Sequence, residues 1–162
     1  MADLEPGTFL LAFALDNRLS ALLTDAFADA PLTPGDFGVT SALRLTEPTR
    51  PGDLAHLLGM RPTTMSNYLR RLADRGLIVR EPDPHDGRAA RVRLTPAGVA
   101  STEACFPGFQ RAAAAYTLAL GEVGLTWDEA GRQLGTLVNA MRLALEILAD
   151  GTLTTADAPS AV

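Results

Sequence analysis

Residues 51–98 read PGDLAHLLGMRPTTMSNYLRRLADRGLIVREPDPHDGRAARVRLTPAG, and this stretch decides the fold. Its first residues predict a short helix, because apolar side chains gather on one helical face. That face consists of Leu54, Ala55, Leu57 and Leu58. Gly59 should end the helix, since glycine enters the left-handed conformation without steric cost. Pro62 then suits the first turn of a second helix.

The second helix is predicted by apolar side chains that recur at the spacing i, i+3, i+4 and i+7. These are Met65, Tyr68, Leu69 and Leu72. Two helices joined by a short turn that contains glycine form a helix-turn-helix. Two short apolar or alternating runs follow, at residues 77–80 and 91–94, and the turn-forming residues 82–87 lie between them. They predict a β hairpin directly after the second helix, which completes a winged helix.

The same stretch resembles the winged helix of MarR-type bacterial transcriptional regulators. The matching pieces are Leu54-Ala55, Leu72 with Gly76-Leu77, the wing run DPHDGR at residues 83–88, and LTPAG at residues 94–98. The family often carries a second arginine where this chain has Gly87, so one wing charge is missing. The resemblance covers the middle third of the chain, and the helical flanks match in length and order only. It implies dimeric, ligand-responsive DNA binding.

The charge distribution favours a nucleic-acid partner despite the acidic total. The chain of 162 residues carries a formal net charge of −5, but residues 61–93 hold eight arginines against four acidic residues, a local balance of +4 that leaves −9 for the rest. A basic centre on an acidic frame concentrates attraction on one face. The single cysteine, the missing signal peptide and the absence of a bilayer-length apolar run predict a cytoplasmic protein without a membrane segment.

Long helices are predicted on both sides of the winged helix. Residues 6–29 carry a broad apolar stripe that must bury itself against the chain's own core or a partner chain. Thr33 should cap a further helix that starts at Pro34 and runs to about Leu45. Residues 47–50 are a connector with the potential to pair with the hairpin as a minimal third strand.

After the wing, Thr95 should cap a long helix that runs to about Gly121. Pro107 lies inside it and predicts a kink near residues 105–108. Thr126 and Glu129 form a second capping box, which opens a last helix with apolar residues at heptad-like spacing. From Gly151 the composition is typical of a disordered tail.

These elements predict a mainly α fold with a winged helix-turn-helix lobe, a small β hairpin and a helical dimerisation lobe. Residues 32–98 should form the DNA-binding domain, residues 1–31 and 99–150 the dimerisation region, and residues 151–162 the tail. The apolar stripes of residues 6–29 and 126–150 are too extensive to be covered by a lobe of this size, which predicts a homodimer.

The polar residues of the second helix are the predicted DNA contacts, since they crowd its start and exposed face. They are Arg61, Pro62, Thr63, Thr64, Ser66, Asn67, Arg70 and Arg71. Thr63, Ser66 and Asn67 should face base edges, and Arg70, Arg71 and Arg91 should hold phosphates. Arg88 at the wing tip should enter the narrow minor groove, oriented by Asp86. Alternatively, the helix start is a cap and a solvated face.

A ligand cleft is predicted between the two lobes, at the expected kink, because aromatic side chains lie at the bend and arginines come from helices expected to face it. Its residues are Phe13, Arg18, Arg44, Cys105, Phe106 and Phe109. Such walls suit an aromatic or anionic compound, although an ordinary core with both arginines in surface ion pairs fits the same residues. His56 and His85 lack further metal ligands nearby, and no cofactor is expected. Cys105 is expected to be structural rather than a redox switch.

The enzyme alternative lacks support, since the sequence has no catalytic triad, no P-loop and no paired-carboxylate motif. A second alternative is a winged helix that serves only as a protein–protein scaffold. The excess of arginine on the second helix and the wing argues against it. The sequence therefore predicts a sequence-specific, double-stranded-DNA-binding transcriptional regulator. The repressor activity and its relief by a small molecule are implied by the resemblance.

Overall fold

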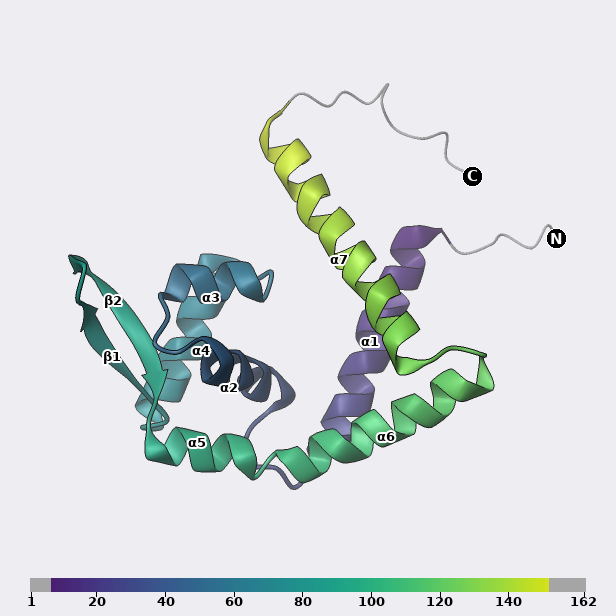
Figure 1. The fold of residues 1–162 in the computed structure, drawn as a ribbon, viewed down its shortest axis with the longest axis horizontal. Helices are drawn as coiled ribbons and strands as arrows, with labels where there is room; N and C mark the ends of the chain where they lie inside the picture. The colour runs from purple at the N-terminus through teal and green to yellow at the C-terminus, as the bar shows by residue number, and fades with distance from the viewer. Residues whose placement is uncertain (1–6, 152–162) are drawn as a thin grey trace. The chain divides into compact units, whose positions relative to one another are not determined.

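The computed structural model describes residues 7–151 of the chain (Figure 1). The elements in order are α1 (Thr8–Ala26), α2 (Pro34–Thr46), α3 (Pro51–Leu57), α4 (Pro62–Asp74), β1 (Ile78–Asp83), β2 (Asp86–Leu94), α5 (Pro96–Glu103), α6 (Phe106–Glu122) and α7 (Trp127–Ala149). The chain divides into two compact units. The central unit is residues 18–112, and the terminal unit combines the residues up to 17 with those from 113 onward. Helices α1 and α6 each contribute to both.

The helix-turn-helix in the central unit is confirmed. Gly59 follows α3 with a φ of 62°, in the left-handed region that the turn requires. Pro62 is the first residue of α4, as the pattern predicts. The prediction for Leu57 was wrong, because that side chain is 57% exposed while Leu54 and Ala55 are buried. Helix α3 is only 7 residues long, so its buried face has room for few side chains.

The hairpin is confirmed and is longer than the apolar runs predict. β1 and β2 pair in antiparallel register, from Ile78 opposite Leu94 to Asp83 opposite Asp86, with an irregularity between Pro82 and Asp83. Polar residues extend both strands because backbone pairing does not depend on side-chain character, and only two residues remain in the connection. The expected third strand exists as a single bridge between Thr49 and Val92.

The kinked long helix was a wrong prediction, because the chain breaks there into two helices. Helix α5 ends at Glu103 and α6 begins at Phe106. Pro107 is the second residue of α6, where the missing N–H of proline costs no helical hydrogen bond. The proline therefore starts a helix instead of bending one.

The core of the central unit joins α2, α3, α4, the hairpin and the residues at the end of α1. Its fully buried members include Val39 and Leu43 of α2, Leu69 and Leu72 of α4, and Val92 of β2. Phe27, near the end of α1, belongs to the same cluster. Helix α4 is thus fixed on one side by apolar contacts, and its other face is exposed.

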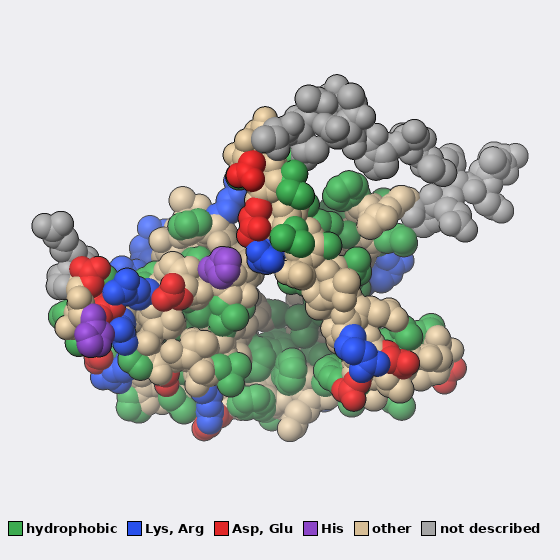
Figure 2. Space-filling view, turned by 45° about the horizontal axis from the view of Figure 1, so that its top comes forward, with side chains coloured by type: hydrophobic (Ala, Val, Ile, Leu, Met, Phe, Trp, Pro, Cys, Tyr) green, Lys and Arg blue, Asp and Glu red, His purple; other side chains and the backbone are tan. Residues whose placement is uncertain are grey.

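The terminal unit carries many exposed apolar side chains (Figure 2). Helix α7 buries only Ala130, whereas Val138, Leu145 and Leu148 are each about two-thirds exposed. The predicted capping box is confirmed, since Glu129 N–H donates to Thr126 and the Glu129 carboxylate accepts from the Thr126 N–H. No helix in residues 7–151 is long and apolar enough to cross a membrane. The predicted disordered tail, apart from Gly151, lies outside the described residues.

Candidate nucleic-acid interface

Helix α4, the recognition helix, presents a continuous polar face because its large aliphatic side chains point into the core. Met65, Leu69 and Leu72 are at most 1% exposed. The predicted contact residues on this helix and at its cap are all exposed: Arg61, Pro62, Thr63, Thr64, Ser66, Asn67, Arg70 and Arg71. A helix anchored on one side and polar on the other is the arrangement that fits a major groove.

The start of α4 is open to an anion. Arg61 occupies the N-cap position and makes no side-chain capping hydrogen bond. The first-turn N–H groups of a helix have no partner inside the helix, and the helix dipole adds partial positive charge there. A DNA phosphate therefore fits this end, beside the hydroxyls of Thr63 and Thr64.

Asn67 and Arg70 are linked to each other on the exposed face. Arg70 Nη2 donates a hydrogen bond of 2.9 Å to the Asn67 Oδ1. This bond leaves both Asn67 amide hydrogens and one oxygen lone pair for a base edge. It also orients the amide, so the pair presents one donor–acceptor pattern instead of two freely rotating side chains.

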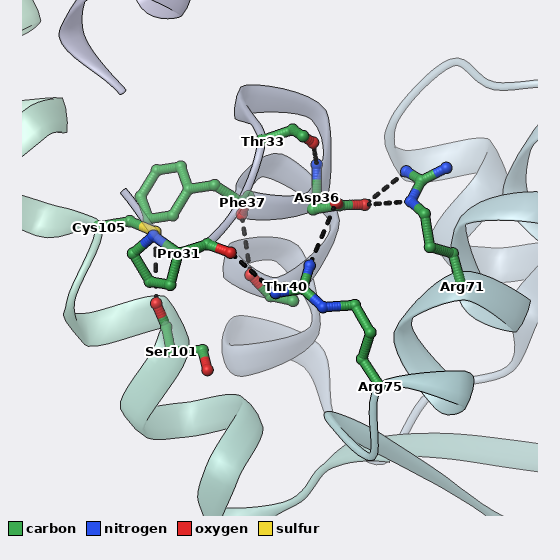
Figure 3. Close-up of polar contacts among 9 residues, drawn as sticks. All are labelled: Pro31, Thr33, Asp36, Phe37, Thr40, Arg71, Arg75, Ser101 and Cys105. Carbon is green, nitrogen blue, oxygen red and sulfur yellow. Dashed lines mark hydrogen bonds and ion pairs between the residues drawn. The ribbon is translucent and has the colours of Figure 1, made fainter. Parts of the chain in front are cut away.

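Arg71 is bound by a carboxylate of the protein itself, a contact that the sequence did not predict. Its guanidinium binds the buried carboxylate of Asp36 in α2, with 2.5 Å from Nη2 and 3.2 Å from Nε to Oδ1 (Figure 3). This hydrogen bond with Asp36 raises the pKa of Arg71. The predicted phosphate contact of Arg71 therefore has a competitor within the protein.

The wing is anchored by a second buried carboxylate, that of Asp83. Its side chain is fully buried at the end of β1, and its Oδ2 accepts from Arg50 Nε at 2.7 Å and from Arg91 Nε at 3.0 Å. Its Oδ1 accepts from the backbone N–H of His85 at 2.9 Å. The His85 N–H, followed by Arg91 and Arg50, holds the pKa of Asp83 well below its usual range. The carboxylate thus stays charged and fixes the hairpin tip to the connector before α3.

Acidic and basic side chains alternate around the rest of the hairpin (Figure 2). Arg93 pairs with Glu81 across the strands at 2.6 Å, and Asp86 lies 3.9 Å from Arg50. The side chain of Arg88 lies outside the described residues, so its predicted minor-groove role and its orientation by Asp86 stay predictions. Arg91, predicted to hold a phosphate, is the wing arginine that Asp83 engages.

The comparisons with known proteins agree with this geometry. The sequence profile of the MarR family matches residues 29–89, from the turn after α1 to the wing. The multiple antibiotic resistance protein MarR of Salmonella typhimurium is 30% identical over 95 residues, which are 59% of this chain and 66% of that protein. The chain belongs to the MarR family.

Solved MarR-family structures extend the similarity beyond the matched segment. A MarR variant from E. coli complexed with operator DNA is 25% identical, with a TM-score of 0.67 over 80% of this chain and 90% of that one. The transcriptional repressor CouR bound to a 23-mer DNA duplex is 25% identical, with a TM-score of 0.72 over 87% of this chain and 96% of that one. The mainly helical fold with its winged hairpin is therefore that of the MarR family.

The central unit of this MarR-family chain also contains a cavity of about 610 Å³. It is lined by Leu23, Phe27, Pro34, Phe37, Gly38, Ser41, Arg44, Leu45, Phe106 and Phe109. Phe37 lies at the centre of the aromatic wall, with its ring centroid 5.8 Å from that of Phe106 and 5.6 Å from that of Phe109. The Ser41 Oγ is buried without a hydrogen-bond partner among the described residues. The wall is thus mainly apolar, with the Ser41 hydroxyl and the side chain of Arg44 as its polar groups.

Three of the six residues predicted for a ligand cleft line this cavity, namely Arg44, Phe106 and Phe109. Arg44 forms a half-exposed ion pair with Glu103 at 2.8 Å. Arg18 is exposed and does not line the cavity, and Phe13 belongs to the terminal unit. The cavity wall also includes Phe27 and Phe37, which sequence reasoning assigned to helix faces and not to a site.

Cys105 lies in the core and not on the cavity wall. Its side chain is buried, and its Sγ–H donates to the Ser101 carbonyl oxygen at 3.3 Å (Figure 3). Burial raises the pKa of the Cys105 thiol, which keeps it protonated and unreactive. This environment favours the structural interpretation of Cys105.

Proposed function

We propose that this chain is a homodimeric, sequence-specific DNA-binding regulator of transcription that represses genes next to a pseudo-palindromic operator. The observation that carries the proposal is the exposed face of α4, which sets the Asn67–Arg70 pair beside an uncapped helix start. In a two-fold dimer, two such helices would enter successive major grooves with half-site centres about 10 bp apart.

Each part of the interface has a proposed role. Thr63, Ser66 and Asn67 face base edges, because hydroxyl and amide groups read donors and acceptors in the major groove. Arg61, Arg70 and the first-turn N–H groups of Thr63 and Thr64 hold phosphates. Arg88 enters the flanking minor groove from the wing that Asp83 anchors. The solved structures of MarR and CouR with DNA support duplex DNA as the partner of this fold.

Selection of bound sequences from a random duplex pool tests the proposal. Enrichment of a two-fold symmetric site with half-sites about 10 bp apart is expected. Binding measured against salt on the selected and a scrambled duplex then separates the two functions that the sequence leaves open. A protein–protein scaffold would enrich no sequence and bind neither duplex, and that result would end the DNA-binding proposal.

The homodimer is supported by the uncovered apolar surface of the terminal unit. Exposed side chains of α1 include Phe9, Leu10 and Phe13, and those of α7 include Val138 and Leu145. Exposed apolar side chains in this number mark an interface, and closed two-fold pairing covers the same surface on both copies.

A small aromatic or anionic ligand is proposed to relieve repression from the cavity in the central unit. The phenylalanine wall suits an aromatic ring, and Arg44 at its edge suits a negative charge once Glu103 is displaced. Benzoate and benzyl alcohol, which share a ring and differ in charge, are suitable probes. Benzoate should raise the melting temperature and weaken DNA binding, and Arg44→Ala should remove its advantage over benzyl alcohol. If neither probe shifts the melting temperature, this part of the proposal fails.

A further inference from the structure

Asp36 connects the start of α2 with the end of α4, two segments that lie far apart in the sequence. It is the third residue of α2, its side chain is 1% exposed, and both of its carboxylate oxygens are directed at arginines of the recognition helix region (Figure 3). Arg71 binds Oδ1, and Arg75 Nη1 lies 3.7 Å from Oδ2. Burial of a carboxylate without compensation is costly, so these two cations are what allows Asp36 to remain there.

The carboxylate is not occupied in capping its own helix. Thr33 caps α2 instead, since its Oγ1 accepts a hydrogen bond of 3.2 Å from the Asp36 N–H. Arg75 also binds the segment before α2, because its Nη2 donates a hydrogen bond of 2.8 Å to the Pro31 carbonyl oxygen. The arginines of the recognition helix region are therefore tied to the start of α2 through several directed bonds.

Arg71 is held from a second side as well. Its guanidinium carbon lies 4.7 Å from the ring centroid of Tyr68, within cation–π range. The Tyr68 hydroxyl in turn lies against Gly35, so closely that a Cβ at position 35 would collide with it. Side-chain packing and charge together hold Arg71 on α2, although half of the Arg71 side chain remains exposed.

We propose that Asp36 is a positioning residue that withholds Arg71 and Arg75 from DNA phosphates and so keeps sequence-independent attraction low. The inference rests on the proposed DNA binding and refines it. Phosphate contacts strengthen binding to every duplex alike, whereas base contacts discriminate. Because one carboxylate engages two arginines and offsets one of their charges, the exposed Asn67 and its neighbours have a larger share in deciding which DNA is bound.

The central test is Asp36→Asn, which keeps the size of the side chain and removes its charge. Affinity is measured from low to high salt on the duplex selected by the unmodified chain and on a scrambled duplex. We expect the scrambled duplex to gain more affinity than the selected one, so that their ratio falls. The slope of log affinity against log salt should steepen by about 0.9 for each arginine that reaches a phosphate.

Two control variants separate withheld charge from other effects. Asp29→Asn removes the same charge from an exposed position of the same unit and should leave the slope and the ratio unchanged, because Asp29 forms no ion pair with another described residue. Asp36→Glu keeps the charge and should restore most of the original ratio. Adding Arg71→Ala to Asp36→Asn should return the slope toward its original value.

Arg71→Ala alone tests whether Arg71 contacts a phosphate. This test stands even if circular dichroism shows that Asp36→Asn is poorly folded. A withheld Arg71 predicts an unchanged salt slope, whereas a slope lower by about one unit would show that Arg71 already binds phosphate and would overturn the inference. An equal loss of affinity on both duplexes for Asp36→Asn, with no change in slope, would also overturn it. If the unmodified chain binds no duplex, the proposed function fails before this question arises.

Discussion

Thr40 and Ser41 are neighbours in α2 whose hydroxyl groups have opposite environments. The Thr40 Oγ1 donates a hydrogen bond of 3.2 Å to the Phe37 carbonyl oxygen in the buried core. The Ser41 Oγ is buried at the cavity without a partner among the described residues. A buried polar atom that lacks a hydrogen bond lowers stability, so the two hydroxyls should respond to removal with opposite signs.

Ser41→Ala should therefore raise the free energy of unfolding by roughly 1 kcal/mol, because it removes the cost of an unsatisfied group. Thr40→Val, which keeps the side-chain shape, should lower it by a similar amount, about 0.5–1.5 kcal/mol. Urea unfolding at one fixed protein concentration measures both, with an unchanged dependence on urea as the check. Destabilisation by Ser41→Ala would show that its hydroxyl has a partner after all.

Asn67→Ala should relax sequence preference and cost on the order of 1–3 kcal/mol per half-site, because a bidentate base contact is lost. Arg70→Ala should weaken the selected and scrambled duplexes and lower the salt slope by about 0.9. It should also reduce preference slightly, since it frees the Asn67 amide to rotate. Titration of both duplexes across salt concentrations measures these effects. An unchanged ratio for Asn67→Ala would remove that residue from base reading.

Asp83→Asn should lower the melting temperature at neutral pH and have a diminishing effect in acid. The pKa of Asp83 is depressed in the folded protein, so its stabilising effect is present above the unfolded pKa of about 4. It is lost as the pH falls through the folded pKa, where the carboxyl is protonated in both states. The difference in melting temperature between the two proteins should thus narrow steadily from pH 7 to pH 2.

Glu81→Gln is the matched control for Asp83→Asn, because Glu81 forms an exposed pair with Arg93 on the same hairpin. An exposed pair contributes little, at most about 1 kcal/mol, so its removal should change the neutral-pH melting temperature only slightly. Parallel curves for Asp83→Asn and the unmodified chain at every pH would contradict the role assigned to the Asp83 carboxylate.

Met141→Arg or Leu145→Arg should yield a monomeric or weakly folded protein, since either places a charge within the exposed apolar face of α7. Light scattering at micromolar concentration measures the mass, and circular dichroism measures helix content. Gln133→Arg adds the same charge at an exposed polar position of α7 and should leave the dimer intact. A monomer for the unmodified chain would refute the proposed homodimer.

Arg88→Ala should weaken binding most on operators with A·T-rich flanks, where the minor groove is narrowest and most electronegative. Two selected duplexes that differ only in their flanks, one A·T-rich and one G·C-rich, provide the comparison. Equal affinity of the variant and the unmodified chain on the A·T-rich duplex would exclude a minor-groove role for Arg88.

The local elements could be predicted because their signals lie close together in the sequence. Gly59 and Pro62 mark the turn of the helix-turn-helix, and Thr126 with Glu129 marks the start of α7. Pro107 misled because the same residue either kinks a helix or begins one. Its position relative to the helix start decides between them, and that depends on packing that the sequence pattern does not contain.

The ion pairs of the interface could not be predicted because their partners are far apart in the chain. Asp36 and Arg71 are 35 residues apart, and Asp83 and Arg50 are 33 residues apart. Asp36 resembles an ordinary first-turn acid, a role that needs no distant partner. The exposed face of α4 was predictable from helical spacing alone, whereas the partner of each arginine on it depends on the tertiary fold.

The burial of Cys105 makes this chain convenient for spectroscopy. It is the only cysteine, and a thiol that is enclosed and protonated reacts slowly with maleimide or iodoacetamide reagents. A cysteine introduced at an exposed position, such as Thr63→Cys on the recognition helix, would therefore take up a fluorophore or spin label selectively in the otherwise native sequence. Distances between labels on two copies of the chain would then be measurable without first removing a native thiol.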